Sequence, residues 1–116
     1  MTMSITRTEI GSRMSQTVTH GDTIYLAGQV GKGADITAQT KDMLANVDRL
    51  LEAVGSSKSH ILSATIWMAN MGDVAGMNAV WDAWVDPKNP PARACIESRL
   101  VTSDYMVEVM IIAAKA

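Results

Sequence analysis

The segment that decides the fold reads Met106-Val107-Glu108-Val109-Met110-Ile111-Ile112-Ala113-Ala114. It predicts the last strand of the chain, from about Tyr105 to Ala114. Successive side chains of a strand point to opposite faces, and here both sets are apolar apart from Glu108. Because such a strand needs a covering layer on each side, the chain should build a sheet that is covered on both faces.

Two upstream segments have the spacing of helices that could form one of these layers. In the first, Asp35 can cap the N-terminus and Gly55 can end the helix. Its inner stripe consists of Ile36, Thr40, Met43, Leu44, Val47, Leu51 and Val54. The second can be capped by Asp73, and its inner side chains are Val74, Met77, Trp81 and Trp84. Two helices cover only one face, so we expect another copy of the chain to cover the second face.

Four further segments are rich in residues that favour strands: Gln16–Thr19, Thr23–Val30, Ile61–Met68 and the residues from Ala92 onward. Gly28, inside the second of them, predicts a bulge or a close approach by another backbone or a ligand. In the third, one face would carry Leu62, Ala64, Ile66 and Met68. The order strand–strand–helix–strand–helix–strand–strand predicts an α+β fold, a mixed sheet with both helices on one face.

The composition narrows the class of protein. A chain of 116 residues forms one domain, spanning residues 1–116, and 47% hydrophobic residues argue against disorder. The formal net charge is −2 and Lys and Arg are scattered, so we expect no nucleic-acid partner. The sequence shows neither a signal-peptide pattern nor an apolar segment long enough to span a membrane, so we expect a cytoplasmic protein.

Cysteine and histidine are scarce. Cys95 is the only cysteine, so an internal disulfide is impossible, which fits a reducing compartment. Together with the distant His20 and His60 it makes no metal-ligand cluster, so no metal site is expected. We expect both histidines to be exposed. A Cys–His nucleophile pair has no local signature here, although the sequence leaves it open.

The segment Pro91-Ala92-Arg93-Ala94-Cys95-Ile96-Glu97-Ser98-Arg99-Leu100 carries the strongest candidate for a site. Pro91 suits the start of a strand, after which Arg93, Cys95 and Glu97 share one face. Arginine grips a carboxylate through two parallel hydrogen bonds, so Arg93 is a candidate anchor for a small organic acid. By residue type alone, a structural ion pair or a plain surface arginine is the commoner role.

The chain resembles the RidA/YjgF family of reactive intermediate (enamine/imine) deaminases, also labelled endoribonuclease L-PSP-like. The resemblance rests on Pro91–Ile96 with Leu100, on Val107–Val109, on Ala27–Gln29, on Leu50–Gly55 and on Met77–Trp81. It covers nearly the whole chain. Ile61–Ile66 and Asn78–Val85 are most similar to the YoaB-like branch.

The resemblance implies a chorismate-mutase-like fold and a homotrimer with clefts between subunits. It also implies hydrolysis of 2-aminoacrylate and related enamine or imine acids to 2-keto acids and ammonia, without a cofactor. By position, Arg93 would bind the substrate carboxylate, and the backbone around Cys95 would contact the imine end, with the thiol of Cys95 lining the cleft. Asn78, Gly28 and Gln29 would line the pocket.

Three positions depart from the pattern of this family. Met110 is matched to a glutamate that positions the attacking water, Met14 to a tyrosine of the cleft, and Ala27 to a hydroxyl residue. A thioether cannot hold water as a carboxylate does. Glu108 is a poor substitute by this interpretation, because it lies ~7 Å from Met110 along the strand.

The departures leave two functions open. The chain is either an enamine/imine deaminase that depends on Arg93, or a non-catalytic trimer that binds a small organic acid as a sensor or regulator. A third function, ribonuclease, follows only from the family label and is disfavoured by the acidic balance.

Overall fold

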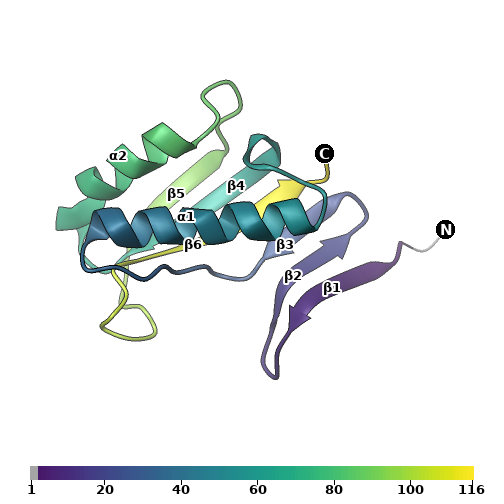
Figure 1. Ribbon diagram of the computed structural model, residues 1–116, viewed down its shortest axis with the longest axis horizontal. Helices are drawn as coiled ribbons and strands as arrows, with labels where there is room; N and C mark the ends of the chain where they lie inside the picture. Colours follow the sequence, from purple (N-terminus) through teal and green to yellow (C-terminus); the bar gives the residue numbers. More distant parts are fainter. Residues whose placement is uncertain (1–2) are drawn as a thin grey trace.

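The computed structural model describes residues 3–116, which form one mixed sheet and two helices (Figure 1). The strands are β1 (Ile5–Ile10), β2 (Ser15–His20), β3 (Thr23–Leu26), β4 (Ile61–Met68), β5 (Ala92–Glu97) and β6 (Val107–Ala114). The helices are α1 (Ile36–Ala53) and α2 (Val74–Trp84), with short 3₁₀ turns at Lys58–His60 and Met71–Asp73. The sheet order is β1-β2-β3-β6-β4-β5, and only β4 and β5 run parallel. The predicted α+β architecture is confirmed.

Helix α1 forms where the sequence predicted it and lies in front of the sheet in Figure 1. The Asp35 carboxylate accepts a hydrogen bond of 2.8 Å from the backbone N–H of Ala38, which caps the first turn. Gly55 follows the helix with a φ of +78°, a left-handed conformation that glycine adopts at little cost. The side chains buried beneath α1 are Gln39, Thr40, Met43, Leu44, Val47, Leu50 and Leu51.

The core lies between the helices and one face of the central strands. On β6, Val107, Val109, Ile111 and Ala113 are fully buried. On β4 the register shifts between Ile61 and Ser63, so Ile61 points into the core and Leu62 is 52% exposed. The prediction that Leu62 shares the inner face is therefore wrong, because a bulge moves one residue out of the strict alternation.

The strand β1 was missed by the sequence analysis. It pairs antiparallel with β2, from Ile5 opposite His20 to Ile10 opposite Ser15. Its residues are exposed except for the half-buried Thr8, so the strand has no apolar stripe to reveal it. The only local signal is its content of Ile and Thr, which favour strands.

Two predicted strand ends and one predicted cap differ from the structure. The strand expected over Thr23–Val30 ends at Leu26, after which Gln29 forms an isolated bridge with Val109. The last strand begins at Val107 rather than near Tyr105. Asp73 precedes α2 but makes no side-chain capping bond. Asn70 instead caps the preceding 3₁₀ turn, Met71–Asp73, because its side chain accepts a hydrogen bond of 2.7 Å from the N–H of Gly72.

The face of the sheet opposite the helices has no covering layer among residues 3–116. Its apolar side chains stay accessible, with Tyr25 at 45%, Ile96 at 47% and Met110 at 39% exposure. Tyr25 is in register with Ile112, and Met110 with Thr65, so these residues share one surface across β3, β6 and β4. We call this surface the open face. Its exposure agrees with the apolar character that β6 showed in the sequence.

Candidate functional site

Arg93 lies on the edge strand of the sheet, on the side that the helices cover. Strand β5 pairs with β4 so that Arg93 is in register with the buried Ala64, and Cys95 with the buried Ile66. In-register residues of neighbouring strands share a face, so Arg93 and Cys95 point toward α2. Cys95 is half-buried against the core, whereas Arg93 is exposed. The predicted sharing of a face by Arg93 and Cys95 is confirmed.

Two residues of α2 hold the Arg93 guanidinium. Its Nη1 donates a hydrogen bond of 2.8 Å to Oδ1 of Asn78, and its Cζ lies 5.3 Å from the centre of the Trp81 ring. Among residues 3–116 the one ion pair joins Arg49 to Glu9, so Arg93 has no carboxylate partner there. Arg93 is therefore not a structural ion-pair residue within the described chain, and most of its five N–H donors remain available.

Glu97, the third residue of this row, has a structural role. Its carboxylate accepts a hydrogen bond of 2.8 Å from the backbone N–H of Met71 and so ties the end of β5 to the turn before α2. His20 and His60 are exposed, as predicted. His60 contacts Ser57 through Nδ1 at 2.9 Å. The structure therefore leaves Arg93, Cys95 and Asn78 as the polar candidates on this side of the sheet.

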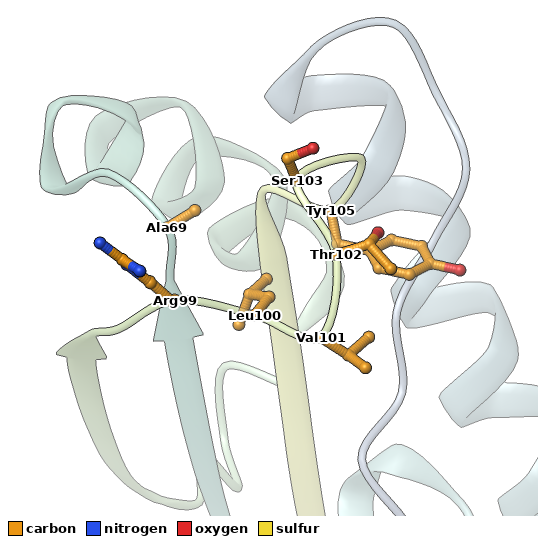
Figure 2. A pocket seen from close by; sticks show the side chains of 7 residues that line it. All are labelled: Ala69, Arg99, Leu100, Val101, Thr102, Ser103 and Tyr105. Atoms are coloured by element: carbon orange, nitrogen blue, oxygen red, sulfur yellow. The ribbon is translucent and has the colours of Figure 1, made fainter.

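One cavity of the molecule lies away from Arg93, and Figure 2 shows the side chains that line it. Its volume is about 430 Å³, and its lining is Ala69, Arg99, Leu100, Val101, Thr102, Ser103 and Tyr105. Ala69 and Arg99 follow the ends of the parallel strands β4 and β5. Arg99 is six residues along the chain from Arg93. This corresponds to ~20 Å of extended chain, so the cavity and the guanidinium of Arg93 form separate sites within one chain.

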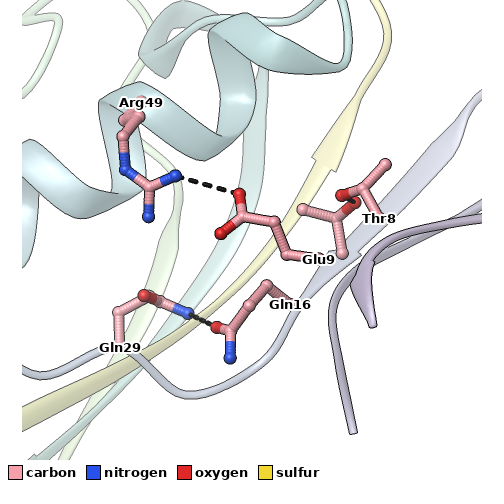
Figure 3. A network of polar contacts seen from close by, with 6 residues as sticks. Thr8, Glu9, Gln16, Gln29 and Arg49 are labelled. Carbon is pink, nitrogen blue, oxygen red and sulfur yellow. Dashed lines mark hydrogen bonds and ion pairs between the residues drawn. The ribbon is translucent and has the colours of Figure 1, made fainter. Parts of the chain in front are cut away.

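The second group of candidates surrounds the segment after β3. Gln29 is buried and exchanges two backbone hydrogen bonds with Val109, at 2.8 and 2.9 Å. Its side-chain Nε2 donates to Oε1 of Gln16 at 2.8 Å (Figure 3) and to the carbonyl of Ala27 at 2.9 Å. Both amide protons of Gln29 are thus used within the chain. Gln29 shapes the turn, while the backbone of the adjacent, exposed Gly28 is open to a ligand.

The same region contains the contact between β1 and α1. Figure 3 shows Arg49 of α1 pointing toward Glu9 of β1, with Nη1 and Oε2 2.9 Å apart. Glu9 has a φ of +48°, which turns its side chain out of the regular strand pattern. Thr8 and Thr17 share a hydrogen bond between their hydroxyl groups. These contacts fix the hairpin of β1 and β2 near Gln16 and Gln29.

Glu108 reaches the same segment from β6. The carboxylate of Glu108 occupies the space beside Gly28 so closely that a β-carbon at Gly28 would collide with its Oε2. Within the chain, the group that approaches Gly28 closely is therefore a side chain and not another backbone, as the sequence had suggested. Partial burial raises the pKa of the Glu108 carboxyl above its ordinary value, because desolvation disfavours the charged form. No side-chain hydrogen bond within residues 3–116 involves this carboxylate.

Met110 and Met14 contribute surface rather than polar contacts. Met110 is 39% exposed on the open face and is in register with Thr65, whereas Glu108 is in register with Trp67. Met14 is 54% exposed in the turn between β1 and β2. The sequence interpretation matched the water-positioning acid to Met110 and set Glu108 aside. In the structure the carboxyl of Glu108 is the acid that lies beside Gly28.

One chain does not bring the two groups together. Arg93 shares a face with Ala64, and Glu108 shares a face with Trp67. Residues 64 and 67 of β4 are three positions apart, so their side chains point to opposite faces of the sheet. Arg93, Asn78 and Cys95 therefore lie on the helix side at the β5 edge. Gly28, Glu108 and Met110 lie by the open face.

Two classes of site are absent from the described residues. No group of three or more His, Cys, Asp or Glu side chains within residues 3–116 is arranged to hold a metal ion. None of the helices in that range has the length and apolar character needed to cross a membrane.

Comparison with known proteins places the chain in a family. The sequence pattern of the family described as Endoribonuclease L-PSP matches residues 6–115. The chain belongs to this family. The RutC family protein YoaB of Escherichia coli is 42% identical over 113 residues, which cover 97% of this chain and 99% of that protein. A RutC family protein of Haemophilus influenzae is 41% identical over 114 residues, covering 96% and 98% of the two chains.

Solved structures of the L-PSP/YjgF family agree with the fold. The crystal structure of NMB1025, a YjgF family member from Neisseria meningitidis, superposes with a TM-score of 0.96 at 43% identity and covers 98% of this chain and 97% of that one. Rv2704 from Mycobacterium tuberculosis, at 25% identity, superposes with a TM-score of 0.87 over 96% and 99% of the two chains. The expected family resemblance and the chorismate-mutase-like fold are thereby confirmed for this YjgF family protein.

Proposed function

We propose that this YjgF family protein hydrolyses reactive enamine and imine acids of the 2-aminoacrylate type to 2-keto acids and ammonia. The observation that carries the proposal is the Arg93 guanidinium, held at the sheet edge by Asn78 and Trp81 without a carboxylate partner among residues 3–116. A guanidinium in this state can bind a carboxylate through two parallel hydrogen bonds. Substrates of this class all carry that carboxylate beside the reacting carbon.

The reaction needs little beyond orientation, a proton and water. The enamine takes a proton at its terminal carbon and becomes an imine, and water then adds to the imine carbon. The C–N bond breaks as the nitrogen gains a proton, so one substrate and one water give one 2-keto acid and one ammonia. Fixing the carboxylate on Arg93 supplies the orientation. The entropy lost in orienting the reactants is a large part of the activation barrier in such reactions.

Glu108 is the group that we assign to proton transfer. Burial raises the pKa of its carboxyl, and a general acid–base group works best with a pKa closer to the working pH. Its position beside the exposed Gly28 gives it access to a ligand bound along that backbone. In this role the carboxylate takes a proton from the attacking water and returns it to the leaving nitrogen. The Cys95 thiol lines the cleft near the imine end.

The two groups can act on one substrate only if two chains meet. Arg93 and Glu108 point to opposite faces of their own sheet. The open face is apolar and uncovered, which is the property of a surface buried between subunits. We therefore propose a homotrimer in which the β5 edge of one chain lies beside Gly28 and Glu108 of the next. Each cleft would then hold one carboxylate-bearing metabolite.

A coupled assay tests the proposal. 2-Aminoacrylate is generated in situ, and the fraction that escapes the protein is trapped with semicarbazide. Wild type should suppress the trapped product, and Arg93→Ala should lose at least roughly 100-fold in kcat/KM, because a charged anchor is removed. Lys41→Ala, which removes an exposed cation of α1, is the matched control and should retain activity. Equal activity of wild type and Arg93→Ala would sink the proposal.

The second function is a carboxylate-binding trimer without catalysis. It is favoured by the apolar side chains of Met14, Ala27 and Met110 near the proposed cleft. This function predicts that wild type binds pyruvate or 2-oxobutyrate, that Arg93→Ala does not, and that neither protein accelerates keto-acid formation. The ribonuclease named in the family description is not part of either proposal, since the net charge is −2 and no basic stripe is visible in the sequence.

A further inference from the structure

We propose that Trp81 is a positioning residue that holds the Arg93 guanidinium flat and aims its free edge at the substrate carboxylate. This inference rests on the proposed carboxylate-binding function of Arg93. It starts from the geometry of α2, where Asn78 and Trp81 are three residues apart. Side chains three apart lie on the same side of a helix, so both reach Arg93 from one helical turn.

The two contacts on Arg93 have different consequences. Asn78 accepts one hydrogen bond from Nη1, which fixes the guanidinium at one point and leaves it free to rotate about that bond. The Trp81 ring lies 5.3 Å from the guanidinium carbon, which is within the range of a cation–π interaction. This second contact restricts the rotation that the single hydrogen bond allows. The donors that Asn78 does not use then keep a defined direction.

Trp81 is itself held in place by its contact with Trp84. It is only 4% exposed, and its ring centre lies 5.4 Å from that of Trp84 at an angle of 53°. The Trp84 indole N–H donates a hydrogen bond of 2.9 Å to Oδ2 of Asp48 on α1, and the Lys58 ammonium lies 5.4 Å from the centre of the Trp84 ring. The ring beneath Arg93 is thus anchored to α1 through residues that lie away from the guanidinium.

Binding and kinetics supply the first test. Trp81→Leu should weaken pyruvate binding, measured by calorimetry, by roughly 3- to 10-fold, as expected for the loss of one cation–π contact. Trp81→Phe keeps a ring and should lie between wild type and Trp81→Leu. In the semicarbazide assay KM should rise while kcat changes little, because the ring positions the anchor and does not take part in proton transfer. Unchanged pyruvate affinity in Trp81→Leu would overturn the inference.

A control separates positioning from stability. Met43→Ala removes a fully buried side chain of α1 and should destabilise the protein by a comparable amount. It leaves the ring beneath Arg93 in place, so its pyruvate affinity should equal that of wild type. If Met43→Ala loses as much affinity as Trp81→Leu, the effect belongs to general stability and Trp81 has no positioning role. If Trp81→Leu does not fold, the comparison is made with Trp81→Phe.

A spectroscopic readout tests the inference without any ligand. The Nε–H resonance of Arg93 in the ¹⁵N-labelled protein should carry the ring-current shift of Trp81, and Trp81→Leu should return it to the position of a free arginine. The same resonance position in both proteins would overturn the inference. This result is independent of turnover. If wild type binds pyruvate in a Trp81-dependent manner but does not deaminate, the enzymatic proposal fails and the role of Trp81 stands.

Discussion

Single residues take their chemical character here from neighbours that are distant in the sequence. Arg93 is 15 positions from Asn78, and Glu108 is 80 positions from Gly28, yet each pair is in contact. Gly28 matters because it lacks a side chain, which leaves room for the Glu108 carboxylate. The residue types were visible in the sequence, but the contacts that separate an anchor from an ordinary surface arginine were not.

The raised pKa of Glu108 makes a prediction about stability and pH. When the folded-state pKa of a carboxyl exceeds its unfolded value, the folded state binds protons more readily, so stability falls as pH rises from the unfolded value through the folded one. Glu108→Gln removes the charge. The substitution should therefore stabilise the protein at pH 7, by under about 1 kcal/mol because solvent screens this half-buried group. It should have no such effect at a pH below both the folded-state and the unfolded-state pKa of Glu108.

Urea denaturation of wild type and Glu108→Gln at pH 7 and at acidic pH measures this difference. The same substitution should remove most of the deaminase activity, so the variant is expected to be more stable and less active. Glu52→Gln, exposed on the outer side of α1, is the matched control and should change neither property. A stabilisation of equal size at both pH values would contradict the assigned pKa direction.

At the scale of elements, the helices and β4 were predictable because their signals are local. Helix α1 has a cap, an inner stripe with helical spacing and a terminal glycine, and β4 was predicted with its observed bounds. By contrast, β1 has no buried face and depends on pairing with β2. The strand predicted up to Val30 ends at Leu26. This end could not be predicted, because strand-forming residue types do not show where the ladder to the neighbouring strand ends.

The cap of α1 can be tested directly. Asp35→Ala removes the acceptor for the N–H of Ala38 and should lower the free energy of unfolding by about 1 kcal/mol. Asp35→Asn keeps a capping side chain and should be close to wild type. Urea denaturation at one fixed protein concentration measures both variants, because an oligomer's stability depends on concentration. Equal losses in the two variants would show that the charge of Asp35, rather than its capping bond, stabilises the helix.

At the scale of the whole molecule, the uncovered sheet face and the divided site point to the same assembly. The open face exposes Tyr25, Ile96 and Met110, while Arg93 and Glu108 lie on opposite sides of the sheet. A second chain would bury the apolar side chains of the open face and would bring its own Arg93 or Glu108 to the missing partner of the first chain. Both features follow from β6 lying in the middle of a sheet that has helices on one side only.

The assembly prediction has two measurable parts. Light scattering at low micromolar concentration should give a mass of about 37 kDa, three times the 12.5 kDa of one chain. Mixed oligomers of Arg93→Ala and Glu108→Gln chains should regain activity that neither variant has alone, because some clefts combine an intact Arg93 with an intact Glu108. A mass near 12 kDa would refute the assembly. A trimer without regained activity would contradict the pairing of Arg93 of one chain with Glu108 of the next.

The sequence by itself determined the family, the α+β class, both helices, β4 and the apolar character of both faces of β6. These features depend on local periodicity, on caps and on residue type, all of which can be recognised within a short window of sequence. The tertiary structure decided which acid approaches Gly28, what holds Arg93, and that these two groups lie on opposite faces. Strand register and the packing of α2 on β5 set those contacts, and both arise between segments far apart in the chain, so no local pattern could reveal them.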